Sequence, residues 1–140
     1  IGHQRVVAIA GTGGEKRRGA SSLGPNCRTQ PEGATAVLVL AEGTVLWGRG
    51  AGAEVTRVVE VCFNTAMTGY QEIMTDPSYA GQMVTFTFPH IGNVGANLED
   101  LETTTPSACG CILRADITEP SNFRAVSHLD GWLKAQGLPA

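Results

Sequence analysis

The fold is decided by residues 58–88, VVEVCFNTAMTGYQEIMTDPSYAGQMVTFTF, in which two apolar strand patterns enclose a short helical pattern. The stretch begins with a run rich in Val, and residues 82–88 alternate Thr with Val and Phe, as a half-buried strand does. Between them, Thr68-x-x-Gln71 is typical of a capping box that opens a short helix. Asp76-Pro77 then predicts a helix N-cap or a turn that changes the direction of the chain.

Strand signals continue on both sides of this stretch. Residues 36–40, Ala-Val-Leu-Val-Leu, form an apolar run typical of a strand buried on both faces. Residues 44–49 return with strand composition after the turn signal Glu42-Gly43, so the two runs predict a β-hairpin. Residues 111–114 predict another short strand. Together these patterns predict an α+β, β-rich fold.

A better-defined helix is expected near the end of the sequence. Ser127-x-x-Asp130 has the spacing of a helix N-cap, and the apolar residues that follow recur on one helical face. Gly137 occupies the position of a left-handed residue after the helix, and Pro139 prevents the helix from continuing.

Composition excludes several classes of protein. The chain has 140 residues, 42% of them hydrophobic and 16% charged, which predicts one compact domain and excludes a disordered chain. The net charge of −3 gives no electrostatic reason to expect a nucleic-acid or anionic membrane partner. No apolar run approaches the ~20 residues of a membrane-spanning helix. With no signal peptide, and with four cysteines in neither a disulfide nor a zinc pattern, we expect a reduced, cytoplasmic protein.

Residues 1–34 differ from the rest of the sequence. They carry five basic side chains, two acidic ones and seven glycines, and after the first ten residues their only large aliphatic side chain is Leu23. Such a segment buries too little surface to offset its ordering entropy, so we predict a flexible Gly-rich basic leader over 1–34 and a domain over 35–140. Within the leader, residues 6–10 run into GTGGEK, which is similar to a phosphate loop but has the wrong glycine spacing.

The residues alone predict no catalytic constellation. His90 is the only histidine in a typically functional place, after a strand end, and a packing role is the stronger interpretation even there. Cys62 is expected to be a buried thiol, and no basic residue adjoins Cys109 or Cys111 to lower its pKa. The other candidates belong to the leader or to solvated surfaces: His3, Cys27, Glu99, Asp100, Glu102 and His128.

Two loops stand out because small polar residues expose their backbone groups. Residues 64–72 join a strand to the short helix, and residues 88–97 are dense in Gly and Asn around the apolar Ile91. Unpaired amides at such a helix start suit a carboxylate ligand or the backbone of a partner. A tight crossover loop without a ligand is an equally good interpretation of each.

Residues 63–97, FNTAMTGYQEIMTDPSYAGQMVTFTFPHIGNVGAN, closely resemble the N-terminal domain of the small, glutamine-hydrolysing subunit of carbamoyl-phosphate synthase. The flanking residues fit that domain in order and spacing, so the resemblance covers about residues 36–140 and leaves out the leader. It implies a swivelling β/β/α domain. In the family this domain precedes a glutamine amidotransferase domain, which carries the Cys–His–Glu machinery.

The resemblance implies a role in making carbamoyl phosphate from glutamine, bicarbonate and ATP, for pyrimidine and arginine biosynthesis. Ammonia released from glutamine passes to the large subunit, the implied partner, which uses ATP and Mg. No catalytic residue, cofactor or metal is expected in this chain. Because the sequence stops before the amidotransferase domain, we expect this fragment alone to be inactive.

Ala66 is the one position to which the resemblance carries a substrate site. The family usually has Ser there, contributing to the glutamine pocket, and Ala keeps the backbone N–H while losing the hydroxyl. We therefore expect main-chain groups to contact glutamine. We also expect segments 68–80 and 88–97 to help dock the large subunit through the exposed apolar residues Tyr79 and Ile91.

Two alternatives from other classes remain open. The chain could be a free-standing, non-catalytic β-rich binding module from a truncated gene, and complex formation with a large subunit would argue against that. It could instead bind nucleotides through the Gly-rich leader, which nucleotide titration followed by the fluorescence of Trp47 and Trp132 would test.

Overall fold

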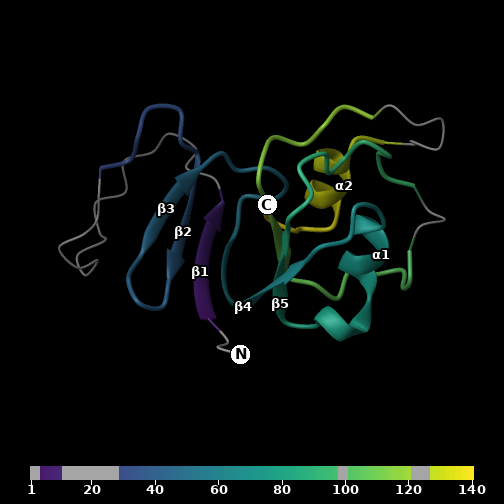
Figure 1. The fold of residues 1–140 in the computed structure, drawn as a ribbon, viewed down its shortest axis with the longest axis horizontal. Coiled ribbons are helices and arrows are strands. Elements are labelled where there is room, and N and C mark those ends of the chain that lie inside the picture. The colour runs from purple at the N-terminus through teal and green to yellow at the C-terminus, as the bar shows by residue number, and fades with distance from the viewer. Residues whose placement is uncertain (1–3, 11–28, 98–100, 121–126) are drawn as a thin grey trace.

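Six strands form one sheet in the spatial order β3-β2-β1-β4-β5-β6 (Figure 1). The protein is described by a computed structural model that covers residues 4–10, 29–97, 101–120 and 127–140. The strands are β1 (Gln4–Ala10), β2 (Ala36–Leu40), β3 (Val45–Gly48), β4 (Thr56–Asn64), β5 (Gln82–Phe86) and β6 (Gly110–Leu113). The helices are α1 (Tyr70–Thr75), the single 3₁₀ turn η1 (Pro77–Tyr79) and α2 (Leu129–Ala135).

The prediction of a flexible leader over 1–34 is wrong for residues 4–10. These residues form β1, which pairs antiparallel with β2 on one side and with β4 on the other. Its sequence, QRVVAIA, is of strand composition, and a strand in the middle of a sheet satisfies its backbone on both edges. Residues 11–28, with the GTGGEK segment, lie outside the described residues.

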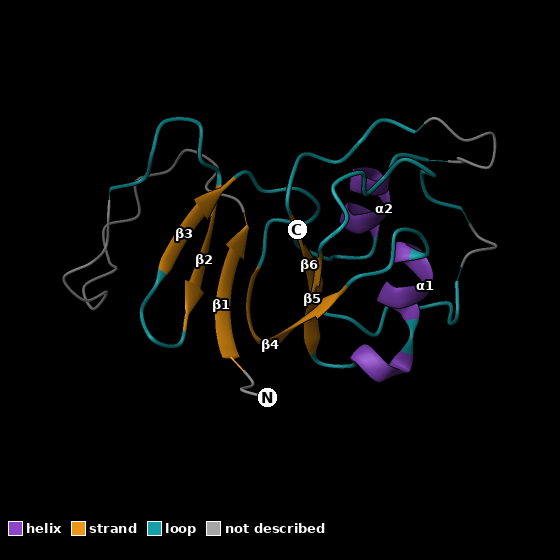
Figure 2. Ribbon diagram, viewed as in Figure 1, coloured by secondary structure: helices purple, strands orange, loops and turns teal. Residues whose placement is uncertain are grey.

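Strand pairing changes character at β4. The hairpin β2–β3 and the pairs β1–β2 and β1–β4 are antiparallel, whereas β4–β5 and β5–β6 are parallel. The parallel pair β4–β5 needs a crossover, which α1 and η1 supply. The helices α1 and α2 lie on the side of the molecule that carries β4–β6, away from the hairpin (Figure 2). The hairpin and the other three strands predicted outside the leader are confirmed, with boundaries within two residues.

Side chains alternate between two apolar layers. On one face of the parallel strands, Val84, Phe86 and Cys111 pack with residues of α1 and α2 in the main core. On the opposite face, Met83 packs with Val59, and Leu38 of β2 packs against them. The sheet therefore curls so that its antiparallel part covers the face that the helices leave free. The two β layers of this single curled sheet, with helices packed on the outer face, confirm the predicted α+β, β-rich fold of β/β/α type.

Some predictions for the helix ends and strand burial need correction. Helix α1 begins after Gly69, whose φ of 80° is left-handed, and no side chain caps it, so the predicted capping box is wrong. Helix α2 is capped by His128 rather than by Ser127, because the His128 Nδ1 atom accepts from the Asp130 N–H at 3.2 Å. Strand β2 is half-buried throughout rather than buried on both faces.

Two predicted helix ends are confirmed. Asp76 caps η1, with its Oδ1 atom accepting from the Ser78 N–H at 2.8 Å. Gly137 has a φ of 68°, and the Leu138 N–H donates to the Leu133 C=O at 2.9 Å, which ends α2 as predicted.

Candidate functional site

The loop that follows β4 is organised by Asn64. The Asn64 Oδ1 atom accepts from the Ala66 N–H at 2.7 Å, and its Nδ2 donates to the Tyr79 hydroxyl at 2.9 Å. The Asn64 backbone C=O accepts from the Thr87 N–H at 3.2 Å, just beyond the end of β5. A side-chain carbonyl that bonds the backbone two residues later forms an Asx turn, the local motif for which Asn is favoured.

The end of β4 and the loop that follows it expose apolar side chains. Phe63 is 73% exposed and Met67 is 66% exposed, and they stand in sequence on either side of the half-buried Ala66. The segment around Ala66 is thus presented at the surface of this domain by a turn with a fixed backbone.

The loop at residues 88–97 has the opposite character. Ile91 is 4% exposed and Ala96 is 1% exposed, and Ile91 belongs to the main core. The expectation that Ile91 offers an exposed contact to a partner is therefore wrong. Tyr79, the other residue named for docking, is half-buried, packs against the core and holds Asn64.

Buried polar groups tie this loop to α1. The side chain of Gln71, 2% exposed, accepts from the Asn97 N–H at 2.8 Å and donates to the Asn97 C=O at 3.2 Å. The hydroxyl of Tyr70 donates to the Gly95 C=O at 2.5 Å. The Gln71 side chain thus bonds the backbone of Asn97, 26 residues later in the sequence, and not the start of its own helix. This explains why the capping box does not form.

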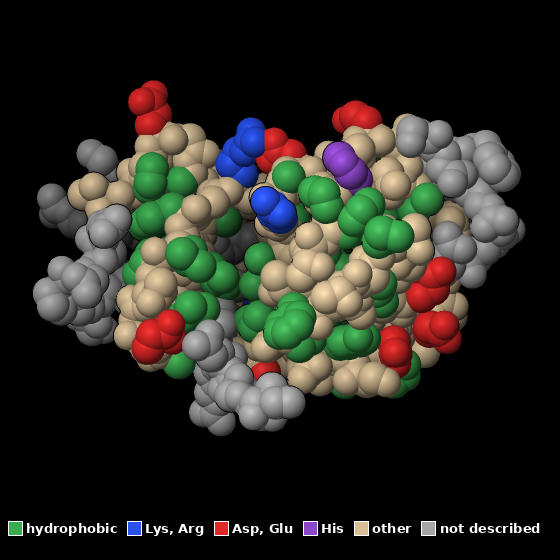
Figure 3. All heavy atoms as spheres, in the orientation of Figure 1, with side chains coloured by type: hydrophobic (Ala, Val, Ile, Leu, Met, Phe, Trp, Pro, Cys, Tyr) green, Lys and Arg blue, Asp and Glu red, His purple; other side chains and the backbone are tan. Residues whose placement is uncertain are grey.

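A cavity of about 840 Å³ lies between the hairpin β2–β3 and the strand β6. Trp47, Met83, Cys111 and Lys134 are among its lining residues, and Ala66 and the two predicted loops are not. Figure 3 shows the hollow between the two halves of the molecule, with Lys and Arg side chains near its rim. This hollow is therefore separate from the substrate site that the resemblance implies.

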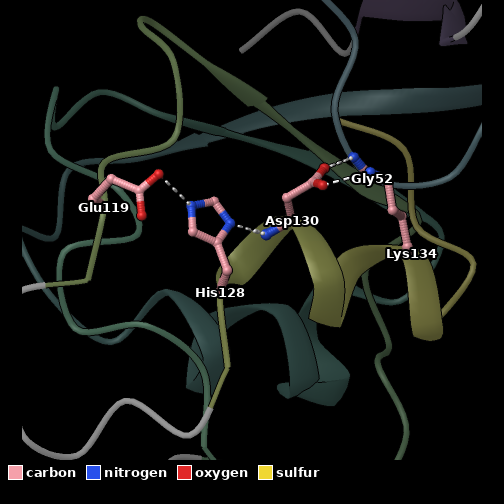
Figure 4. A network of polar contacts seen from close by, with 5 residues as sticks. All are labelled: Gly52, Glu119, His128, Asp130 and Lys134. Atoms are coloured by element: carbon pink, nitrogen blue, oxygen red, sulfur yellow. Dashed lines mark hydrogen bonds and ion pairs between the residues drawn. The ribbon is translucent and has the colours of Figure 1, made fainter.

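A polar network marks the start of α2 beside this cavity (Figure 4). Asp130 accepts from the Gly52 N–H at 2.7 Å and from Lys134 Nζ at 2.5 Å. Although partial burial opposes ionisation, these hydrogen bonds and the charges of Lys134 and His128 hold the pKa of Asp130 below its ordinary value. The network joins α2 to the chain before β4. The His128 Nε2 and Glu119 Oε1 atoms are 3.7 Å apart, which is too far for a hydrogen bond.

The cysteines have no reactive setting among the residues that the structure describes. Desolvation raises the pKa of Cys111 to about 12 and also raises that of Cys62, whose thiol donates to the Met83 C=O at 3.8 Å. Cys109 is half-buried and free. His90 is exposed and meets Phe88 edge to face, with ring centroids 5.7 Å apart.

Several predicted surface or leader candidates fall outside the described residues: His3, Cys27, Glu99 and Asp100. Glu102 is exposed, and its backbone N–H donates to the Thr75 hydroxyl at 2.9 Å. Within the described ranges, His, Cys, Asp and Glu side chains form no group of three or more that could hold a metal ion. Nor do those ranges contain a helix with the length and apolar character needed to cross a membrane.

The family resemblance pointed to Ala66, and the sequence analysis missed the residues that hold its backbone. Asn64 carried a recognisable signal, because Asn two residues before a small residue in a loop is typical of an Asx turn. The bond from Asn64 to Tyr79 joins residues 15 apart, and no local pattern predicts such a contact.

Comparison with known proteins extends over most of the chain. Residues 38–140 match the family described as carbamoyl-phosphate synthase small chain, CPSase domain. The chain is 69% identical over 108 residues to the carbamoyl phosphate synthase small chain of Bradyrhizobium diazoefficiens and 68% identical over 108 residues to that of Rhizobium meliloti. Each alignment covers 74% of this chain and 27% of the relative.

A third relative, the carbamoyl phosphate synthase small chain of Mesorhizobium japonicum, is 64% identical over 110 residues, with 76% of this chain and 28% of the relative covered. The chain thus spans about a quarter of the length of the curated relatives it matches. On the match over residues 38–140 and these identities, the chain belongs to the carbamoyl-phosphate synthase small chain family.

Proposed function

We propose that this chain acts as the N-terminal domain of a glutamine-hydrolysing carbamoyl-phosphate synthase small chain. In this proposal the loop at 64–69 helps to close the glutamine site, and the domain docks on a large chain. The complete cytoplasmic enzyme makes carbamoyl phosphate from glutamine, bicarbonate and ATP for pyrimidine and arginine synthesis. ATP and Mg serve the large chain, and the present domain alone has no activity.

The observation that carries this proposal is the exposed, fixed turn at Ala66. A glutamine pocket formed between this loop and another domain of the subunit would cover Phe63 and Met67, which are mostly exposed here. The relatives are almost four times as long as their matched part, so their chains have room for such a domain. Burial of two large apolar side chains would stabilise the closed pocket.

The geometry refines how Ala66 would contact glutamine. Because the Ala66 N–H already donates to Asn64 Oδ1, that group is not available to the substrate. The role therefore falls to the Ala66 carbonyl, to its methyl group and to the neighbouring main-chain groups. An alanine at this position leaves more room than the serine common in the family, and it supplies no hydroxyl.

Docking on the large chain is proposed for the segment at 68–80 rather than for 88–97. Pro77, Ser78 and Ala80 are exposed around η1, whereas half of the residues in 88–97 are buried, Ile91 among them. Titration of the domain with a large chain would test this directly, and Ser78→Arg is expected to weaken complex formation. If the segment does not dock, Ser78→Arg will leave the complex unchanged.

The glutamine role is tested by Ala66→Leu in the complete small chain assembled with its large chain. We expect the KM for glutamine to rise at least about tenfold, equivalent to ~1.4 kcal/mol, while the rate with ammonia as nitrogen source stays unchanged. The matched control is Ala41→Leu, which alters an exposed alanine in the β2–β3 turn. Equal use of glutamine by Ala66→Leu and the unaltered enzyme would refute the proposal.

A second substitution, Ala66→Ser, restores the hydroxyl and measures its contribution to the KM for glutamine. If main-chain contacts compensate fully, the KM for glutamine will not change. A tenfold fall in KM would correspond to ~1.4 kcal/mol, the size of a normal hydrogen bond, and would show that compensation is incomplete.

A further inference from the structure

We propose that Asn64 is a positioning residue for glutamine use, because it fixes the backbone turn that presents Ala66. This inference rests on the proposed function of the Ala66 loop and adds a residue to it. Asn64 would not touch the substrate. Its effect would pass through the conformation of residues 65–67, the part of the loop that would meet the substrate.

Asn64 is bonded in three directions at once. Its side-chain oxygen holds the Ala66 N–H at 2.7 Å, and its side-chain nitrogen reaches the Tyr79 hydroxyl at 2.9 Å. Its backbone C=O accepts from the N–H and the hydroxyl of Thr87, at 3.2 and 3.4 Å. The end of β4, the turn η1 and the segment after β5 therefore meet at this one residue.

The orientation of the Asn64 amide follows from chemistry. A backbone N–H can only donate, so the atom that faces Ala66 must be the amide oxygen. The NH₂ group is then directed to Tyr79, where the hydroxyl oxygen accepts. Asp could supply the acceptor but not the donor, and Ala could supply neither.

The loop has little else to hold it. Thr65 and Met67 are exposed, and the side chain of Ala66 is a single methyl group. Gly69, which follows closely, has a left-handed φ of 80° and adds backbone freedom. Without the Asn64 bond, this loop would sample several conformations, and binding glutamine would have to select one of them. A loop that is already ordered before glutamine binds loses less conformational entropy on binding.

The experiment compares three variants in the complete synthase: Asn64→Ala, Asn64→Asp and Thr87→Val. Asn64→Ala removes the bond to Ala66, and we expect the KM for glutamine to rise about fivefold or more, with the rate on ammonia unchanged. Asn64→Asp keeps an acceptor for Ala66, so its KM should stay within about twofold of the unaltered value. Thr87→Val removes only the hydroxyl bond to Asn64 and is the matched control, with no expected change in KM.

Thermal unfolding separates positioning from a merely structural role. A structural role would lower Tm and leave the KM for glutamine unchanged, whereas positioning raises KM in Asn64→Ala and spares it in Asn64→Asp even if both lose the bond to Tyr79. Amide exchange on the unaltered enzyme adds a measurement that needs no variant. The Ala66 N–H should exchange more slowly than the N–H of Met67, and equal exchange would overturn the inference.

The outcomes also separate this inference from the function on which it rests. If Ala66→Leu raises the KM for glutamine but Asn64→Ala does not, the loop is at the substrate site and Asn64 has no positioning role. If neither variant changes KM, the proposed function of the loop fails, and the inference fails with it. A rise in KM for both variants, with Asn64→Asp close to normal, supports both.

Discussion

The loops at 64–69 and 88–97 are similar in sequence and different in structure. The first consists mostly of small polar residues and the second is dense in Gly and Asn, both follow a strand of the parallel part of the sheet, and both contain a large apolar side chain. In the first loop that side chain, Met67, is 66% exposed. In the second, Ile91 is 4% exposed and lies in the core, and the backbone is tied to α1 by Tyr70 and Gln71.

The two loops therefore have different roles in this domain: the first keeps its side chains at the surface, and the second packs into the core. The loop at 64–69 is fixed at one point by Asn64 and keeps its surface free for a partner or ligand. The loop at 88–97 uses its apolar and polar groups to complete this domain. Substitutions should therefore change stability in the second loop and function in the first.

The largest effect is expected from Ile91→Ala. Because Ile91 is buried among core residues, truncation should lower the free energy of unfolding by about 3 kcal/mol. Urea denaturation of the 140-residue chain measures this, with Ile91→Val as a graded control that should cost about 1 kcal/mol. A loss below about 0.5 kcal/mol would mean that 88–97 is a surface loop after all.

Next in size is Gln71→Ala. It removes the two buried hydrogen bonds to the Asn97 backbone, so we expect a loss of about 2 kcal/mol in the free energy of unfolding. Glu72→Ala, at the half-buried neighbouring position, is the control for helix propensity. Equal unfolding midpoints for the two variants would contradict the view that Gln71 holds the loop.

Acid should destabilise the folded chain through Asp130, a residue of α2 that lies outside both loops. The pKa of this carboxyl is lowered in the folded state, so its stabilising contribution is complete above its unfolded pKa of about 3.9 and is lost as the pH falls through the folded-state pKa. Asp130→Asn should therefore reduce the loss of stability below about pH 4. Identical pH profiles of unfolding for the variant and the unaltered chain would contradict this assignment.

The smallest effect on stability is expected from Met67→Ala. Since Met67 is mostly exposed, its truncation should change the free energy of unfolding of this domain by no more than about 0.5 kcal/mol. In the complete small chain, where the proposed pocket covers Met67, the same change should raise the KM for glutamine. A large loss of stability in the isolated domain would remove the contrast between the two loops.

Local patterns predicted most of the strands and both helices. The alternation of Thr with Val and Phe in residues 82–88 and the Gly137-Leu138-Pro139 ending are local signals, and both correspond to the structure. The strand β1 was missed because the long Gly-rich segment after it outweighed the strand composition of seven residues. Its pairing with β2 and β4 is non-local, and such partners supply the stability that composition alone does not reveal.

The candidate site was less predictable than the fold. Composition made the two loops look alike, because a sequence pattern does not tell whether Ile91 points into a core or Met67 into solvent. Gln71 fits a capping box by spacing, yet its side chain prefers a buried partner that only the folded chain supplies. Ala66 came from resemblance to a family, and no physical signal in an alanine would have selected it.

The most direct test of this account is amide exchange of the complete synthase with and without glutamine. We predict that glutamine slows exchange at residues 65–69 and leaves residues 88–97 unchanged, because only the first loop is proposed to meet the substrate. Protection confined to 88–97, or none in either loop, would contradict the assignment of the Ala66 loop to the glutamine site.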